Sequence, residues 1–222
     1  MRWVFLLVVL CTVLGCSKGP GRNHKPQPVI AHTAANSDSI PAGDAKQSGT
    51  YTLTPESRFE VKTEKAGVLG GFAHSHVIRA RTFVGVMTYD AQNPGNSKFE
   101  ITVAAEGLEV LTAAKESDKS KIRQTMFTKV LKVKQFPDIA FVSRNVTGTE
   151  NGVRIEGDLT LLDQTRPVSV DVILKEQGDK LSAQGTFSIL QSDFGIKPYS
   201  AALGSIKVAN KVTFDFEAIG TR

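Results

Sequence analysis

Apolar and polar residues alternate along several stretches of the chain, and this period of two constrains the fold more than any other feature. The alternating stretches are residues 98–105, 153–161, 168–174, 181–189 and 212–216. Successive side chains of a β-strand point to opposite faces, so each stretch can present one apolar face. Glycines within strand patterns, such as Gly85, Gly157 and Gly185, either make room at a barrel wall or mark a bulge or bend.

Short turn signals separate these stretches and indicate how the strands connect. They are Asn93-Pro94-Gly95-Asn96, Glu150-Asn151-Gly152 and Gln177-Gly178-Asp179. Short connections place sequential strands side by side and antiparallel. Such strands must close into a barrel or pack as a sandwich, because an open sheet would leave its apolar face wet and its edges unpaired.

One segment, residues 115–133, departs from the strand pattern. Its apolar residues recur at spacings of three and four with basic residues between them, which predicts an amphipathic helix. Ser117 or Asp118 is the expected N-cap, and the helix should end before Phe136-Pro137. Such a helix covers one mouth of a barrel or packs against its outside, and the sequence alone leaves both arrangements open.

The first residues indicate an export signal. A short basic start precedes an apolar run over residues 3–14, which is too short for a membrane-spanning helix of about 20 residues. The run ends in Val13-Leu14-Gly15-Cys16, which resembles the lipobox of bacterial lipoproteins, where cleavage precedes a lipid-bearing cysteine. We therefore expect a signal peptide over residues 1–15 and a membrane anchor on Cys16. Ordinary signal cleavage, which gives a secreted or periplasmic protein, is the alternative.

Residues 16–49 differ in composition from the rest of the mature chain. They are rich in Ser, Pro, Gly, Asn and Ala without a hydrophobic period, so we expect a flexible tether followed by one domain over residues 50–222. The domain contains no cysteine and hence no disulfide, because the two cysteines of the chain are Cys11 and Cys16. Ser17 fits outer-membrane sorting by resemblance to other lipoproteins, so the expected location is the bacterial cell envelope, at the periplasmic face of the outer membrane.

The charge balance excludes nucleic acid as a partner. The net charge is +5, and only residues 115–134 are dense in lysine. A nucleic-acid-binding surface usually combines a basic stripe with interleaved aromatic residues, whereas the aromatic residues here fall on apolar strand faces. We expect at most a loose attraction to anionic lipid head groups.

Several ordered motifs give the domain a family likeness. They lie at residues 136–143, 157–161 with 165–168, 192–196 and 212–218. In order and spacing they resemble the YceI-like family, and the likeness runs from about Thr50 to Ala218. Two departures are Gln191, where family members often have Arg, and residues 70–77, which fit a histidine-containing variant. These departures weaken any inference about contacts to a ligand head group.

The resemblance implies an antiparallel lipocalin-like β-barrel that encloses a long apolar amphiphile, such as a polyisoprenoid or a quinone-like lipid. The protein would then be a carrier, store or sensor without enzymatic activity, and its only bound cofactor would be such a lipid. The expected apolar lining is Phe99, Ile101, Phe141, Ile155, Leu159, Val170, Phe187 and Phe214. His74 and His76 share one face of a strand and are expected to make polar contacts at the barrel mouth.

Two other functions stay open from the residues alone. Alternating apolar faces also suit a core filled by side chains, in which case the domain would be an interaction module for an envelope partner. His74 and His76 could instead begin the metal site of an enzyme, but zinc sites normally require three or four protein ligands and the domain has no third His or Cys. For lack of a third ligand, we expect no metal. Because neither a nucleophile elbow nor a phosphate-binding loop is present in the sequence, we expect no catalytic residue either.

Overall fold

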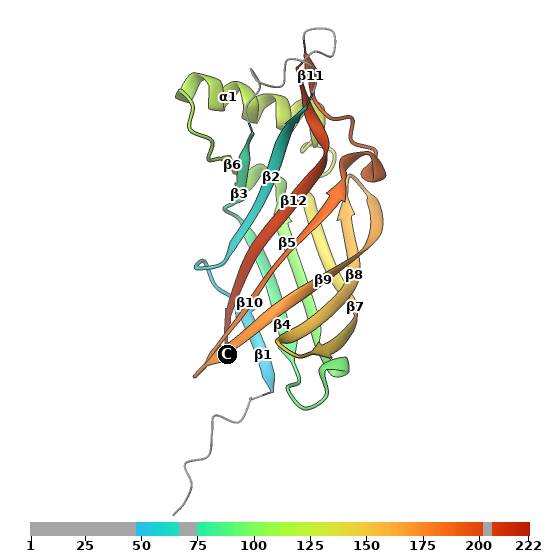
Figure 1. Cartoon of the computed structure of the whole chain (residues 1–222). Coiled ribbons are helices and arrows are strands. Elements are labelled where there is room, and N and C mark those ends of the chain that lie inside the picture. Colours follow the sequence, from blue (N-terminus) through green and yellow to red (C-terminus); the bar gives the residue numbers. More distant parts are fainter. Residues whose placement is uncertain (1–47, 67–74, 202–205) are drawn as a thin grey trace, which may run out of the picture. The chain divides into compact units, whose positions relative to one another are not determined.

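The computed structural model describes residues 48–66, 75–201 and 206–222 (Figure 1). The strands are β1 (Gly49–Leu53), β2 (Arg58–Ala66), β3 (Val77–Ala80), β4 (Phe83–Tyr89), β5 (Lys98–Ala104), β6 (Leu108–Val110), β7 (Asp138–Thr149), β8 (Gly152–Leu161), β9 (Gln164–Gln177), β10 (Lys180–Leu190), β11 (Ser200–Ala201) and β12 (Ile206–Thr221). The helix α1 (Glu116–Thr125) continues as a π-helical segment, Met126–Val130. Short 3-10 turns lie at Pro94–Asn96, Ala105–Gly107 and Gln191–Phe194.

Some of the sequence-based predictions concern residues that lie outside these ranges. The signal peptide predicted over residues 1–15, the proposed lipidation site Cys16, nearly all of the tether 16–49 and the histidine His74 all lie outside the described residues.

The twelve strands of the described residues form one antiparallel sheet that closes on itself. Three long strands are each interrupted by a short break: β1 continues as β2, β3 continues as β4, and β5 continues as β6. Both β1 and β2 pair with β12, both β1 and β2 pair with the β3/β4 strand, and that strand pairs with β5 and β6. With the two-residue β11 set aside, eight long strands therefore form a closed ring. The predicted all-β barrel with one helix is confirmed.

The predicted strand faces are confirmed most clearly in β8. Val153, Ile155, Leu159 and Leu161 are all buried, whereas the intervening Arg154 and Glu156 are exposed. The strand pairs with β7 on one side and β9 on the other, so its inner face is shielded along its whole length. Alternation in the sequence thus translates directly into an apolar interior.

Glycines at the inner wall make room for aromatic rings. A Cβ added to Gly157 would lie 2.6 Å from a ring carbon of Phe141 and 2.6 Å from the carbonyl oxygen of Val142. A Cβ on Gly185 would lie 2.8 Å from the ring of Phe216. Of the two roles expected for these glycines, the structure supports close packing at the wall.

The turns between strands match the predicted signals, with one addition. Gly178 lies at φ +58° in the turn between β9 and β10, where its missing side chain removes the steric penalty. The turn between β8 and β9 consists of Leu162 and Asp163, both at positive φ. That backbone geometry normally selects Gly, Asn or Asp, so Asp163 fits the turn, whereas Leu162 gave no signal for it.

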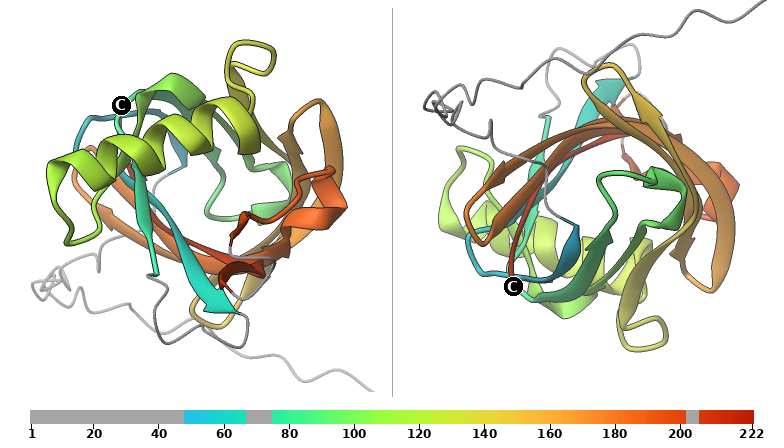
Figure 2. Two further views of the ribbon diagram at one scale, coloured as in Figure 1. Left: turned by 90° about the horizontal axis from the view of Figure 1, so that it is seen from above. Right: turned by 90° about the horizontal axis from the view of Figure 1, so that it is seen from below.

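The helix lies across one end of the barrel (Figure 2). Its residues Ile122, Met126 and Val130 face the interior cavity at that end, so the helix covers a mouth and does not pack against the outer wall. The predicted N-cap at Ser117 or Asp118 was wrong, because Lys115 occupies that position and the carboxylates of the first turn interact favourably with the helix dipole instead. Among the described residues, no helix is long and apolar enough to cross a membrane.

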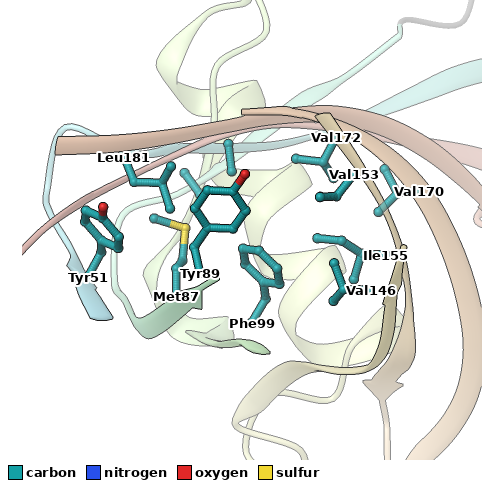
Figure 3. Close-up of a cluster of buried hydrophobic side chains, with 12 residues drawn as sticks. Tyr51, Met87, Tyr89, Phe99, Val146, Val153, Ile155, Val170, Val172 and Leu181 are labelled. Atoms are coloured by element: carbon teal, nitrogen blue, oxygen red, sulfur yellow. The ribbon is translucent and has the colours of Figure 1, made fainter. Parts of the chain in front are cut away.

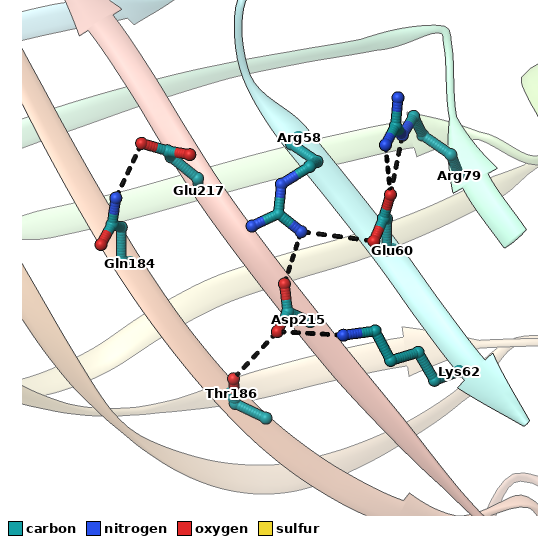
Figure 4. A network of polar contacts seen from close by, with 8 residues as sticks. All are labelled: Arg58, Glu60, Lys62, Arg79, Gln184, Thr186, Asp215 and Glu217. Atoms are coloured by element: carbon teal, nitrogen blue, oxygen red, sulfur yellow. Dashed lines mark hydrogen bonds and ion pairs between the residues drawn. The ribbon is translucent and has the colours of Figure 1, made fainter. Parts of the chain in front are cut away.

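An ion-pair network spans the seam where β2 meets β12 and β3 (Figure 4). The guanidinium of Arg58 donates to Asp215 at 2.5 Å and to Glu60 at 3.3 Å. Arg79 donates to the other oxygen of Glu60, and Lys62 lies 3.4 Å from Asp215. The hydrogen bond from Arg58 is the main reason that the pKa of Asp215 lies below its usual value.

Gly157→Ala should lower the free energy of unfolding by about 1 to 3 kcal/mol, because the new methyl group has no space beside Phe141 and the β7 backbone. Urea denaturation measures this loss. Gly95→Ala is the matched control, since its nearest atom would be 3.9 Å away. Equal losses in both variants would contradict the packing role of Gly157.

Asp215→Asn should lower the free energy of unfolding by roughly 0.5 to 1 kcal/mol at neutral pH. A carboxylate with a lowered pKa in the folded state stabilises the protein above its unfolded pKa of about 3.9, and this contribution is lost as the pH falls through the folded pKa. The gap between wild type and variant should therefore close below about pH 4. Denaturation across pH measures the gap, with Glu150→Gln in an exposed turn as the control. A difference in the free energy of unfolding that does not change with pH would contradict a stabilising role for the ionised Asp215 carboxylate.

Candidate functional site: the interior of the barrel

The interior of the barrel contains two adjoining cavities. The central cavity has a volume of about 130 Å³, and the cavity under α1 has a volume of about 290 Å³. Their walls have five residues in common, Val61, Ile78, Leu108, Ile139 and Phe214, so the two cavities lie end to end. Their combined volume of about 420 Å³ lies within the range of about 300 to 1,000 Å³ that is typical of small-molecule sites.

The wall of the central cavity is almost entirely apolar. Two of its aromatic side chains, Phe187 on β10 and Phe214 on β12, stack with ring centroids 4.8 Å apart and planes 8° from parallel. Glu60 and Asp215 lie at its edge, but both carboxylates are engaged in the ion-pair network at the seam. The central cavity therefore offers dispersion contacts and almost no directional polar contact.

The structure places all of the predicted lining residues around the central cavity. They are Phe99, Ile101, Phe141, Ile155, Leu159, Val170, Phe187 and Phe214. They come from six strands that span much of the sequence, and Phe214 also borders the cavity under the helix. Contact of these side chains with a ligand stays a prediction.

The end of the barrel opposite α1 is filled by side chains (Figure 3). Met87 and Phe99, 1% and 3% exposed, form the last layer that borders the central cavity, and we call them the floor. Beyond the floor, Tyr51, Tyr89 and Leu181 pack without bordering either cavity. The interior is thus a filled core at one end and hollow at the other.

Polar contacts seal the closed end below the floor. Arg222 donates a hydrogen bond of 2.9 Å to the hydroxyl of Tyr51, and its guanidinium lies 5.0 Å from the centre of that ring. Burial, together with the nearby Glu176 carboxylate, raises the pKa of Tyr89. A guest therefore has no access from this end.

The cavity under α1 reaches the surface, and we call this opening the mouth. Its wall includes Lys121 on α1 and Tyr199, which is 45% exposed. His76 also lines it, with its Nδ1 3.2 Å from the Thr112 hydroxyl, and its contact with a ligand stays a prediction. Within the described ranges, no group of three or more His, Cys, Asp or Glu side chains could hold a metal.

Gln191 is a mouth residue whose role the sequence did not reveal. It is 7% exposed, lines the mouth cavity and donates a hydrogen bond of 2.8 Å to the carbonyl of Ala209. Ala209 lies in an irregularity of β12 between Val208 and Val212, where the pairing with β2 shifts. The departure of Gln191 from the pattern that the resemblance implied was visible in the sequence, but its long-range partner was not.

Fold and interior together define the class: a closed eight-stranded lipocalin-like barrel with an internal apolar cavity. Residues 51–219 match the model of the YceI-like domain. The chain therefore belongs to the YceI-like family.

Curated relatives agree with this membership over part of the chain. A UPF0312 protein of Pseudomonas aeruginosa is 31% identical over 125 residues, which cover 54% of this chain and 62% of the relative. Protein YceI of Salmonella arizonae is 33% identical over 99 residues, which cover 45% of this chain and 49% of the relative. The matches thus span less than two thirds of the length of those relatives.

Solved structures confirm the fold. BcnA of Burkholderia cenocepacia superposes with a TM-score of 0.62 at 17% identity and covers 76% of this chain and 99% of its own. A polyisoprenoid binding domain from Saccharophagus degradans, implicated in plant cell wall breakdown, gives a TM-score of 0.57 at 10% identity, with coverages of 79% and 99%. At these identities the likeness is one of fold.

Proposed function

We propose that this protein binds the tail of a long apolar amphiphile, a polyisoprenoid or a quinone-like lipid, inside its barrel. It serves as a non-enzymatic carrier, store or sensor in the bacterial cell envelope. The observation that carries the proposal is the apolar hollow, which is sealed at the floor and reaches the surface beside α1. The fold neighbour from Saccharophagus degradans, named for polyisoprenoid binding, supports the choice of ligand class by analogy.

The energetics of the hollow favour a hydrocarbon guest. Each methylene transferred from water to an apolar site contributes about 0.8 kcal/mol to the free energy of binding. Water molecules bind poorly in such a cavity because it offers them no hydrogen-bond partners. The polar side chains His76, Gln191 and Lys121 all lie at the mouth. A ligand would therefore enter tail first, with its polar head beside α1.

The envelope location rests on the N-terminal sequence. The apolar run ending at Cys16 supports export and acylation, and multiple acyl chains on one cysteine suffice for stable anchoring. We therefore propose that Cys16 anchors the protein at the periplasmic face of the outer membrane, and that the segment 16–49 links the anchor to β1.

A prenyl or other long-chain compound should be released when the full-length protein, purified from bacterial cells, is denatured and analysed by mass spectrometry. Ile101→Trp should reduce the recovered amount at least tenfold, because the indole fills the central cavity. Val84→Trp is the matched control, since Val84 lies on the outer face and is 69% exposed. The mass of the N-terminal peptide in the same sample shows whether Cys16 is acylated.

Recovery of no long-chain compound from the wild type would reject the carrier proposal and favour an interaction module. Equal recovery from Ile101→Trp and Val84→Trp would place the ligand outside the barrel.

Phe99→Leu should allow the barrel to accept a longer tail, because a smaller side chain at the floor deepens the hollow. Thermal-shift titration with prenyl alcohols of increasing length measures the longest tail that stabilises each variant. Val146→Ala also removes buried volume at the filled end, but it does not border the hollow, so its length limit should match the wild type. An unchanged limit in Phe99→Leu shows that the floor does not set tail length.

A further inference from the structure

The positive charge of the protein is concentrated at the end of the barrel that holds α1. Residues 115–134 carry seven Lys or Arg and two Asp or Glu, a net charge of +5, which equals that of the entire chain. The remaining 20 basic and 20 acidic residues cancel, because the chain has 27 and 22 in total. Apart from this segment, the sequence has no net charge.

Most of these cations are available to an external partner. Lys129, Lys132 and Lys134 are exposed, and no carboxylate of the described residues lies within ion-pair distance of them. Arg123 is also exposed, and its guanidinium lies 5.0 Å from the ring centre of Phe127. Arg123, Lys132 and Lys134 line a wide surface groove beside the helix, together with Phe127 and Glu106.

Further cations lie across the mouth from α1. Lys65, near the end of β2, and Lys207, near the start of β12, are both exposed beside Val208, which lines the mouth cavity. Tyr199 is exposed at the same rim, and tyrosine suits a boundary between water and hydrocarbon because its ring is apolar and its hydroxyl polar. Cations and an amphipathic aromatic residue therefore surround the opening of the apolar hollow.

We propose that the α1 end of the barrel docks on an anionic membrane surface, so that the mouth of the hollow faces the lipid. Basic residues near an anionic leaflet each strengthen binding severalfold, and the field falls off within a Debye length. Because the rest of the chain has no net charge, an anionic surface would also orient the barrel with its mouth forward. This proposal goes beyond ligand binding, because docking requires the charged surface and no particular ligand.

Vesicle sedimentation with the full chain tests the docking surface. The vesicles contain phosphatidylglycerol and phosphatidylcholine in equal parts, or phosphatidylcholine alone, and no prenyl lipid. Lys129→Gln combined with Lys134→Gln should lower partitioning into the anionic vesicles roughly 30-fold at low salt. Lys98→Gln combined with Lys175→Gln removes the same charge from exposed positions toward the filled end and should have little effect.

Two further comparisons keep the test independent of any lipid on the N-terminal segment, which is the same in both variants. The difference between anionic and neutral vesicles should vanish near 1 M salt, where the Debye length is about 3 Å. Hydrogen exchange on anionic vesicles should slow at residues 116–135 and stay unchanged in the turns at 150–152 and 177–179. Equal partitioning of the two double variants, or protection confined to those turns, overturns the proposal. Failure here leaves the ligand-extraction result unaffected, so the two proposals can fail separately.

Discussion

Ring closure is the constraint on which the rest of this structure depends. β12 pairs with β10 along one edge and with β1 and β2 along the other, so the sheet has no free edge where the long strands meet. Once the ring is closed, every second side chain of every long strand must enter one shared interior. The breaks within β1/β2, β3/β4 and β5/β6 let three strands bend while they keep their neighbours. Interior chemistry is therefore decided strand by strand, by the residues at alternate positions.

The interior is filled unevenly because its side chains differ in size along the barrel axis. At the closed end, Tyr51, Met87, Tyr89 and Phe99 meet in the middle and leave no cavity beyond the floor. Toward α1 the wall consists mainly of aliphatic side chains, and the ring of Phe141 occupies the space that a side chain at Gly157 in the neighbouring strand would take. The same fold thus supplies a stabilising core and a hollow, and the helix lies across the end of the hollow beside the mouth without filling it.

Much of this architecture could be predicted from the sequence, because period-two alternation and turn residues are local signals. Alternation identified the strand faces, and with the family resemblance it led to a set of lining residues that all border the central cavity. The division between floor and hollow could not be predicted, since it depends on which side chains from distant strands meet across the barrel. Two features were missed for different reasons: the turn between β8 and β9 places the atypical residue Leu162 at positive φ, and the partner of Gln191 is a long-range contact.

Both ends of the described domain emerge at the sealed end. Gly49 begins β1 close to Arg222: a Cβ added to Gly49 would lie 3.1 Å from the Nε of Arg222. β12 has 16 residues, or about 50 Å of extended strand, and the tilt of barrel strands shortens this to roughly 40 Å along the axis. Any attachment at either terminus therefore holds the domain at its sealed end, with the mouth roughly 40 Å away along the barrel axis. The barrel thus fixes the distance and the direction of the mouth from the attachment, in addition to enclosing a cavity.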